Sequence, residues 1–326
     1  MRAIVIGHSG GPEVLELRDV PAPGPGPGEI LVRVRAVGLN RADILQRKGH
    51  YPAPPGVPAD IPGLEYAGEV AALGEGVTRW KPGDRVMGLV AGGACAEFLV
   101  AHEDTAISAP AAWPYAEAAA VPEAFLTAYD AIIRQLHLAA GESVLIHAVS
   151  SGVGTAALQL AHAWGARTFG TSRSAEKLGR AVPLGLDVAI DSSREDFAEV
   201  VRRETGGRGV DVALDLVGGP ALEGNLRALA LRGRMIIVGL TAGRSAQLDM
   251  GLVLNKRLTI VGTALRSRSL EEKARLTGDF EREVMPLFAA GRLRPVLDRS
   301  FPMAEAAEAH RVMEANAHFG KLVLVW

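Results

Sequence analysis

The sequence contains little cysteine, little excess charge and no long apolar run, and each shortage excludes a class of protein. Its 326 residues include one cysteine, Cys95, so no disulfide can form within the chain, which favours a reducing compartment. The 35 Lys and Arg against 37 Asp and Glu leave a net charge of −2, with no basic excess to hold nucleic-acid phosphates. The longest apolar run, 86–96, contains two adjacent glycines, Gly92 and Gly93, whereas a membrane helix needs ~20 apolar residues. We therefore expect a soluble cytoplasmic protein.

Two different patterns divide the chain. The first third contains short alternating runs such as 31–35 and 66–70, separated by Gly- and Pro-rich turns, which predicts a small barrel or sandwich of short strands. From about residue 123, strands at 144–148, 168–171, 187–190, 210–217, 234–239 and 258–263 alternate with helices at 155–164, 174–184, 195–205 and 221–230. Strict alternation predicts a parallel, doubly wound sheet. Helices over 270–290 and 304–316 and a strand over 320–326 complete the chain.

A glycine-containing turn joins the first strand of the alternating region to its first helix. Strand 144–148 runs into Ser150–Gly154, and the helix begins at Thr155. A helix N-terminus offers free N–H groups and a partial positive charge, and glycine allows a close approach of the backbone. This context favours a dinucleotide pyrophosphate site. The turn lacks a full G-x-G-x-x-G, so an ordinary tight strand–helix turn stays open as the alternative.

The residues after the second strand select between dinucleotide cofactors. An NAD enzyme usually has Asp or Glu there, on the ribose 2′-hydroxyl. Here Arg173 follows the strand, no acidic residue occurs before Glu176, and Lys177 comes next. A guanidinium suits a 2′-phosphate, so the segment favours NADPH. Arg173 could equally be a solvated surface charge.

Several segments resemble the zinc-free quinone oxidoreductases, the zeta-crystallin-like branch of the medium-chain dehydrogenase/reductase superfamily. They are Val37–Asp43, Ile61–Glu65, Gly83–Val86, Leu126–Ala128 and Gly152–Gly154. Others resemble the tumour-suppressor-inducible quinone oxidoreductase type: Gln46–Tyr51, Ser151–Ala157, Leu265–Arg268, Pro295–Arg299 and Met313–Asn316. The resemblance implies an α/β fold with a GroES-like β-barrel domain, 1–124 and 267–326, and a Rossmann nucleotide-binding domain, 125–266.

The resemblance also implies a function: reduction of a quinone by hydride from NADPH, in a homodimer or homotetramer paired through the edge strand 258–263. The catalytic residues that we predict are Tyr51 and Asn40. The predicted cofactor contacts are Tyr51, Thr127, Ser151, Gly152, Val153, Gly154, Thr155, Arg173, Lys177, Leu265 and Asn316. Tyr51 lies in a Pro-rich loop, where a packing role is the alternative. Relatives often carry a tyrosine at position 192, where this chain has serine.

Zinc chemistry is not expected. Alcohol dehydrogenases of the superfamily bind catalytic zinc through Cys, His and Cys, and the matching positions here are Asn40, Leu64 and Glu123. Leucine cannot ligate, and zinc prefers thiolate and imidazole to a carboxamide. The eight histidines show no ligand spacing.

Two other functions remain open at this point. The same scaffold can reduce the double bond of an enal, enone or enoyl thioester, and the sequence barely discriminates between that substrate class and quinones. A non-enzymatic role, as a structural or RNA-binding protein, is disfavoured by the net charge and by the lack of an aromatic and basic platform.

Overall fold

The structure, a computed structural model, describes residues 1–326, and the chain forms two compact units. Unit 1 comprises Met1–Leu126, Leu265–Leu287 and Pro295–Trp326, and unit 2 comprises Thr127–Ala264 and Phe288–Arg294. Unit 2 is therefore largely an insertion in unit 1. Residues 288–294, which we expected in the barrel domain, belong to unit 2 instead. None of the helices combines the length and the apolar character that a bilayer-spanning helix requires.

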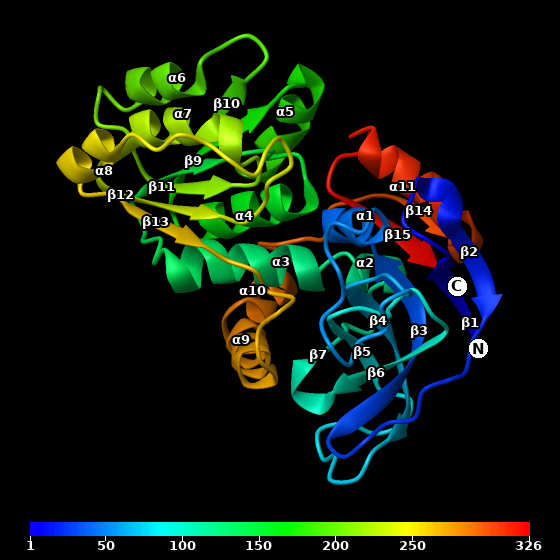
Figure 1. Cartoon of the computed structure of the whole chain (residues 1–326). Coiled ribbons are helices and arrows are strands. Elements are labelled where there is room, and N and C mark those ends of the chain that lie inside the picture. Colours follow the sequence, from blue (N-terminus) through cyan, green and yellow to red (C-terminus); the bar gives the residue numbers. More distant parts are fainter. The chain divides into compact units, whose positions relative to one another are not determined.

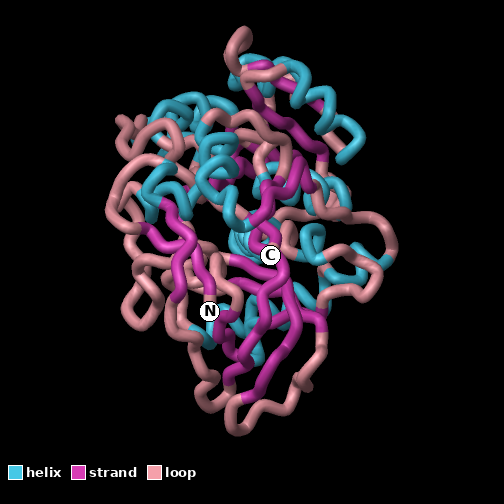
Figure 2. The backbone as a smooth tube through the Cα atoms, turned by 90° about the vertical axis from the view of Figure 1, so that its right-hand side faces the viewer, coloured by secondary structure: helices cyan, strands magenta, loops and turns pink.

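Unit 1 is built mainly from antiparallel strands (Figures 1 and 2). Its seven-stranded sheet has the order β14-β15-β3-β4-β5-β7, with β6 also paired to β3, and β1 and β2 form a separate pair. The strands are β1 Arg2–Ile6, β2 Leu15–Asp19, β3 Glu29–Gly38, β4 Glu65–Leu73, β5 Arg85–Leu89, β6 Phe98–His102, β7 Ala106–Ser108, β14 Leu297–Pro302 and β15 Lys321–Val325. The C-terminal strand β15 thus pairs with β3 from the first part of the chain.

Strand β3 illustrates how the sequence forms this sheet. Ile30, Val32 and Val34 alternate along it and are buried, while Arg33 between them is exposed. Successive side chains of a strand point to opposite faces, so the alternation places the aliphatic side chains in the core. That core consists of aliphatic residues from the strands and from the C-terminal segment.

The helices of unit 1 connect and cover the strands. They are α1 Arg41–Arg47, α2 Tyr115–Ala118, α3 Pro122–Ala128, which continues into unit 2, α9 Leu270–Glu283, α10 Met285–Ala289 and α11 Ala306–Glu314. The single helix expected over 270–290 is two helices. Pro286 has no N–H and its ring clashes with the preceding turn, which accounts for the end of α9 at Glu283.

Unit 2 contains a six-stranded sheet with the order β10-β9-β8-β11-β12-β13, and every strand pair is parallel. The strands are β8 Ser143–Ile146, β9 Arg167–Ser172, β10 Val188–Asp191, β11 Val210–Asp215, β12 Leu229–Ile237 and β13 Thr259–Gly262. The helices are α4 Gly152–Ala163, α5 Ala175–Ala181, α6 Phe197–Glu204, α7 Leu222–Ala228 and α8 Met250–Lys256, and a π-helix spans Tyr129–Gln135. In Figure 1, α6 and α7 lie on one side of the sheet and α4 on the other. The predicted doubly wound sheet is confirmed.

Two details of unit 2 differ from the expectation. The helix expected over 221–230 ends at Ala228, because Leu229 already pairs with Val210 as the first residue of β12. Helix α8 was not expected, and its apolar residues Met250 and Leu254 are each 75% exposed. A pattern search looks for apolar residues that face a core, and its signal is weak here because only Leu252 and Val253 of this helix pack against the core.

Candidate active site

The carboxyl ends of β8, β9 and β11 meet at one edge of the unit 2 sheet, because its strands run parallel. In such sheets ligands bind outside the carboxyl ends, where the strand order reverses. That point is β8, which has β9 on one side and β11 on the other. Seven predicted cofactor contacts lie in the segments that follow β8 and β9: Ser151, Gly152, Val153, Gly154, Thr155, Arg173 and Lys177.

The turn that leaves β8 leads directly into α4. The Ser151 Oγ caps this helix by accepting a hydrogen bond from the Gly154 N–H at 3.1 Å. Thr155 is occupied within the turn, since its hydroxyl donates to the Gly152 carbonyl at 3.0 Å. The N–H groups of Gly152 and Val153 have no partner in the chain. Two free donors at the positive end of a helix can bind an anion such as a pyrophosphate.

Gly154 allows α4 to start close to the end of β8. A Cβ at this position would lie 2.4 Å from the Ala148 carbonyl oxygen and 2.8 Å from backbone atoms of Val149, which no side chain can tolerate. Ala148 itself has a left-handed φ of 47°, a conformation that costs a non-glycine residue energy. The tight turn is therefore built into the backbone, and Gly154 is the residue that permits it.

A free cation follows the end of β9. Arg173 is exposed and makes no contact with another charged or hydrogen-bonding side chain of the protein. The half-buried Lys177 lies in the first turn of α5, whose cap is the Ser174 Oγ, 3.3 Å from the Lys177 N–H. Ser192, which replaces the tyrosine of many relatives, is exposed just beyond β10. No acidic side chain stands at the end of β9 to repel a phosphate.

A buried chain of hydrogen bonds links three strand ends at the same edge. The two ring nitrogens of His147 lie 2.9 Å from the Thr171 Oγ1 and 2.6 Å from the Asn225 Oδ1. The Asn225 Nδ2 donates to the Asp215 Oδ2 at 3.1 Å. Burial lowers the pKa of His147, so its ring is neutral and bridges its two neighbours. These four residues lock β8, β9, β11 and α7 together.

Asp215 also fixes the loop that follows β11. Its other carboxylate oxygen accepts hydrogen bonds from the N–H groups of Val217 and Gly218, at 2.7 and 2.9 Å. The Thr241 hydroxyl in turn donates to the Leu216 carbonyl at 3.0 Å. The loops after β11 and β12 are therefore tied to each other and to the sheet, which gives the predicted cofactor edge a rigid floor.

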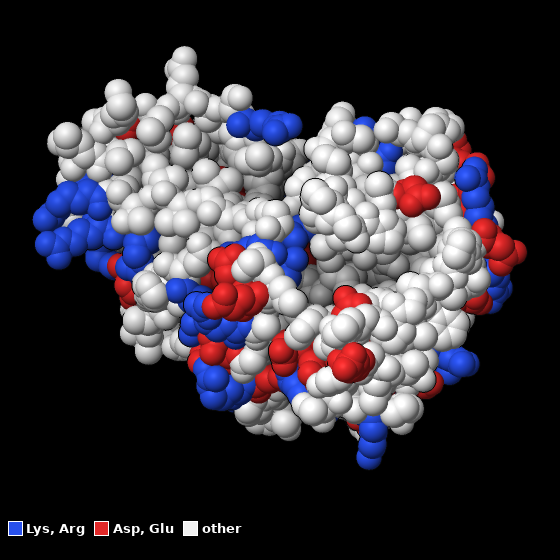
Figure 3. All heavy atoms as spheres, turned by 60° about the horizontal axis from the view of Figure 1, so that its bottom comes forward, with Lys and Arg blue, Asp and Glu red and all other residues white.

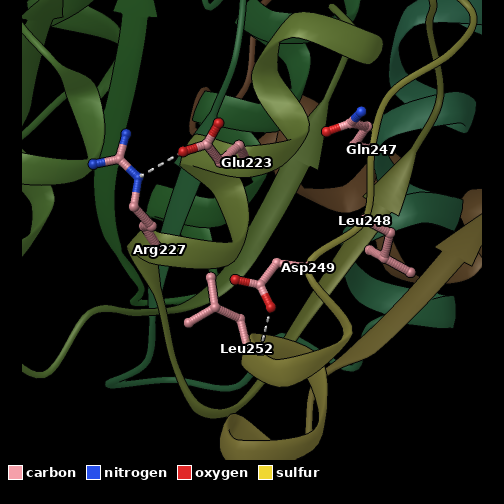
Figure 4. A pocket seen from close by; sticks show the side chains of 6 residues that line it. All are labelled: Glu223, Arg227, Gln247, Leu248, Asp249 and Leu252. Atoms are coloured by element: carbon pink, nitrogen blue, oxygen red, sulfur yellow. Dashed lines mark hydrogen bonds and ion pairs between the residues drawn. The ribbon is translucent and has the colours of Figure 1, made fainter.

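A pocket of about 290 Å³ lies elsewhere in unit 2, between α7 and the start of α8 (Figure 4). Glu223, Arg227, Gln247, Leu248, Asp249 and Leu252 line it. Its charged groups already have partners: Asp249 caps α8 by accepting from the Leu252 N–H at 3.0 Å, and Arg227 pairs with Asp196 at 2.9 Å. None of the predicted site residues lines this pocket.

A buried ion pair forms the polar centre of unit 1. The Lys321 Nζ lies 2.5 Å from the Glu65 Oε1, and the two side chains are 4% and 0% exposed. Lys321 also donates to the Leu39 carbonyl at 2.6 Å and to the Asn40 Oδ1 at 2.7 Å. Glu65 accepts in addition from the Asn40 Nδ2 at 2.9 Å and from the Glu123 N–H at 2.7 Å. Both charges are thus fully hydrogen-bonded, as a buried pair requires.

This ion pair joins two of the positions that hold zinc ligands in alcohol dehydrogenases. Asn40 and Glu123 both bond to Glu65, the residue after Leu64. A protein ammonium group therefore supplies the positive charge of this cluster. No group of three or more His, Cys, Asp or Glu side chains placed to hold a metal ion occurs in the structure. The oxygen and the nitrogen of the Asn40 carboxamide both form hydrogen bonds within this cluster. The role that fits these bonds is to hold the cluster in place.

Tyr51 is held by an arginine. The Arg266 guanidinium lies over the Tyr51 ring, 5.1 Å from its centroid, and its Nη1 donates to the Tyr51 carbonyl at 3.1 Å. The Tyr51 hydroxyl makes no hydrogen bond with the protein, and burial raises the pKa of this half-buried phenol. A side chain that is fixed at its base and free at its hydroxyl is suited to contact a ligand.

The remaining predicted contacts have local roles that the structure defines. Asn316 has a left-handed φ of 53° after α11, and its Oδ1 accepts from the Arg41 Nη2 at 2.7 Å. Leu265, in unit 1, and Thr127, in unit 2, are each 7% exposed. Within unit 1 the structure thus places Asn40, Tyr51, Leu265 and Asn316, and within unit 2 the rest. Whether each contacts a cofactor stays a prediction.

Sequence reasoning missed three features of the site. Lys321 looked like an ordinary strand residue, although a lysine at the start of an apolar strand is a signal for a buried pair. Arg266 was recognised only as part of a matching segment. The chain of His147, Thr171, Asn225 and Asp215 joins residues that are up to 78 positions apart, and no local pattern connects them.

Comparison with known families identifies the relatives of this chain. Residues 26–131 match the alcohol dehydrogenase GroES-like domain, and residues 152–283 match the zinc-binding dehydrogenase family. A quinone oxidoreductase of Pseudomonas aeruginosa is 38% identical over 319 residues, 97% of each chain. The chain belongs to the medium-chain dehydrogenase/reductase superfamily. The absence of zinc from this chain stays a prediction, based on Asn40 and Leu64 at positions that we expect to correspond to zinc ligands of the superfamily.

Solved structures of the superfamily agree with the fold. The crystal structure of Escherichia coli quinone oxidoreductase complexed with NADPH is 31% identical, with a TM-score of 0.91 over the whole of both chains. The CurK enoyl reductase is 29% identical, with a TM-score of 0.89 over 99% of this chain and 98% of that one. The predicted superfamily and the GroES-like plus Rossmann architecture are confirmed. As a member of this superfamily, the protein is an oxidoreductase.

Replacing Lys321 tests the ion pair. In Lys321→Met the Glu65 carboxylate stays buried without its counter-charge, so unfolding should become easier by about 3–5 kcal/mol. Chemical denaturation monitored by fluorescence measures this loss. The double variant Lys321→Met/Glu65→Gln should recover part of it, whereas Lys48→Met, which breaks an exposed pair, should change little. A single variant as stable as the wild type would show that the pair is not needed.

Asp43 should titrate far from its ordinary range. Burial raises the pKa of Asp43 from 3.8 to about 6, although the N–H groups of Asn40 and Gly63 donate to it. A raised carboxyl pKa means that the folded state binds the proton more tightly, so stability from this group is present below about pH 4 and is lost as the pH rises through about 6. NMR of ¹³Cγ-labelled aspartate, with Asp43→Asn for assignment, should give a midpoint near 6, and a midpoint below 4.5 would contradict the burial argument.

Proposed function

We propose that this protein is an NADPH-dependent quinone reductase that transfers hydride without zinc. The observation that carries the proposal is the 38% identity over 97% of both chains to a quinone oxidoreductase. The proposal has a second support in unit 1, where a lysine ammonium is paired with Glu65 beside the former ligand positions. A quinone needs no Lewis acid, because hydride addition gives an aromatic hydroquinone anion.

The residues of unit 2 fit NADPH. The free N–H groups of Gly152 and Val153, together with the dipole of the 12-residue helix α4, would hold the pyrophosphate. The exposed and unpartnered Arg173, with Lys177 nearby, would hold the 2′-phosphate through charge-assisted hydrogen bonds. The turn has no room for side chains at Gly154. NADPH is also present in the Escherichia coli relative.

The residues of unit 1 act mainly by positioning and by proton supply. When bound, NADPH supplies the hydride. The Tyr51 hydroxyl, which has no partner in the protein, would donate a hydrogen bond to a substrate oxygen and pass its proton to that oxygen as negative charge develops there. Asn40 would hold the Glu65–Lys321 cluster in place. These roles require no further reactive side chain.

A reductase of activated C=C bonds is the second candidate. The similarity of fold to the CurK enoyl reductase, with 29% identity, favours it. An RNA-binding role has less support: on the face of the molecule drawn in Figure 3, basic and acidic side chains are mixed near the centre, and the basic side chains without acidic neighbours lie apart, at the left end, the top and the bottom. A nucleic-acid surface is expected to be basic throughout.

A substrate panel separates the two reductase functions. Purified protein would be assayed for NADPH oxidation at 340 nm with benzoquinones, naphthoquinones, an enal, an enone and an enoyl thioester, with and without a metal chelator. The proposal expects the highest kcat/KM with a quinone and no effect of the chelator. A higher kcat/KM with the enoyl thioester or enal would establish the alternative, and loss of activity on chelation would refute the zinc-independent mechanism.

Cofactor preference should depend on Arg173. A charge-assisted hydrogen bond contributes about 1.5–3 kcal/mol, so Arg173→Ala should raise the KM for NADPH by roughly 10- to 100-fold. The KM for NADH should stay nearly constant, because NADH has no 2′-phosphate. Arg203→Ala, which removes an exposed arginine of α6, is the matched control. Equal loss with both cofactors, or a wild type that uses both equally, would refute the assignment.

We also propose that two chains pair through β13. This strand is at the edge of its sheet, with β12 as its one partner, and such an edge is open to a further strand. Apolar side chains of α8 and the preceding segment add to that surface: Leu248, Met250 and Leu254 are 46%, 75% and 75% exposed. Light scattering should give twice the 34.2 kDa of the chain, or four times for a tetramer, and a monomer would contradict the pairing.

A further inference from the structure

Arg266 is buried, and three segments of unit 1 depend on its side chain. It is 6% exposed. Its Nε donates to the Ala91 carbonyl at 2.6 Å, its Nη1 to the Tyr51 carbonyl at 3.1 Å and its Nη2 to the Gln46 Oε1 at 2.6 Å. One planar guanidinium therefore connects α1, the loop that carries Tyr51 and the loop after β5.

This guanidinium has no carboxylate partner. All three of its hydrogen bonds go to neutral oxygens, and it forms no ion pair. An arginine has five N–H donors, so two remain available. A buried charge without a counter-ion is costly, and burial lowers the pKa of Arg266 accordingly. Such a charge is retained where negative charge appears during function.

Tyr51 is the group that this arginine fixes most directly. The guanidinium covers the ring face at 5.1 Å and also bonds to the Tyr51 carbonyl. Ring and backbone are thus both held, whereas the hydroxyl has no partner. A fixed ring holds the hydroxyl oxygen at one position, from which its O–H group can reach a ligand.

We propose that Arg266 is a positioning residue for Tyr51, aiming its hydroxyl and stabilising the phenolate that remains when the proton leaves. The inference rests on the proposed quinone reduction. In that step the hydride of NADPH adds to the quinone, the Tyr51 O–H bond breaks, and its proton bonds to the hydroquinone oxygen anion. Tyr51 is then reprotonated from water. The quinone thus gains two electrons and two hydrogens, one as hydride from NADPH and one as the proton of Tyr51.

The charges around Tyr51 favour this role. Arg266 attracts the phenolate, and Glu123 opposes it. Lys273 lies beside Arg266, with its Nζ donating to the Arg266 carbonyl at 2.8 Å. Asp43 and Glu123 act on Arg266 from a greater distance. Arg266 is the cation closest to the ring, so its removal should leave the phenol in a less positive surrounding.

Four variants test the proposal in the full-length protein. Tyr51→Phe removes the proton, Arg266→Met removes the charge, and Arg266→Lys keeps the charge without the planar fork. Arg275→Met removes an exposed arginine of α9 that pairs with Glu271 and serves as the matched control. Each would be measured for kcat and KM with the best quinone, for NADPH affinity by fluorescence, and for tyrosine ionisation by absorbance at 295 nm.

The expected results are specific to positioning. Arg266→Met should lower kcat roughly 10- to 100-fold, less than the ~10²–10⁴-fold contributed by a general acid, because Tyr51 is still present but no longer held. NADPH affinity should be unchanged. The Tyr51 ionisation step, identified by its loss in Tyr51→Phe, should move to higher pH. Arg266→Lys should restore the ionisation step but only part of kcat, and Arg275→Met should match the wild type.

Other results would overturn the inference. Full kcat in Tyr51→Phe would remove the need for the residue that Arg266 positions. An unmoved ionisation step in Arg266→Met would show that the charge is dispensable. Full rescue of kcat by Arg266→Lys would show that the planar contact is dispensable. The ionisation and NADPH measurements need no quinone, so they still decide the contact between Arg266 and Tyr51 if the substrate panel refutes quinone reduction.

Discussion

The ion pair between Glu65 and Lys321 is the interaction on which the candidate site of unit 1 depends. Two charges removed from water repay the cost only when each finds several partners, and here every hydrogen of the ammonium group is used. The pair fixes the position of Asn40, of the Glu123 backbone N–H and of the start of β15, where Lys321 lies.

In unit 2, buried hydrogen bonds align the ends of the strands. Parallel strands deliver their carboxyl ends to one edge, and the buried chain from Thr171 through His147 and Asn225 to Asp215 keeps those ends in register. The turn at Gly154 and the free N–H groups at the start of α4 then occupy a defined place. A neutral His147 suits this function, because one ring nitrogen donates to the Asn225 Oδ1 and the other can accept from the Thr171 hydroxyl. A charged ring has no acceptor nitrogen.

The sequence predicts the alternating sheet well, because the signal is local. Several strands of unit 2, such as β8 and β11, are short and largely apolar, and they alternate with helices, so the order of elements follows from patterns within about 20 residues. The glycine turn and Arg173 are local as well. The contact between Lys321 and Glu65 is not, since these residues are 256 positions apart, and neither is the clamp of Arg266 on Tyr51, which spans 215 positions. Helix α8 was missed for another reason: Leu252 and Val253 pack against the core, but Met250 and Leu254 are exposed, so the helix has no continuous apolar face.

The distance in sequence between Glu65 and Lys321 also bears on how the protein is made. A ribosome releases residue 65 long before residue 321, so the first part of unit 1 must wait for a strand that is synthesised much later. Unit 2 has all but seven of its residues between positions 127 and 264 and can form its sheet earlier, as domains do during synthesis. Until β15 arrives, the Glu65 carboxylate has no cation and the neighbouring strand edge of β3 is open. The nascent chain therefore spends its longest interval with an incomplete sheet, the stage at which a chaperone would be of most use.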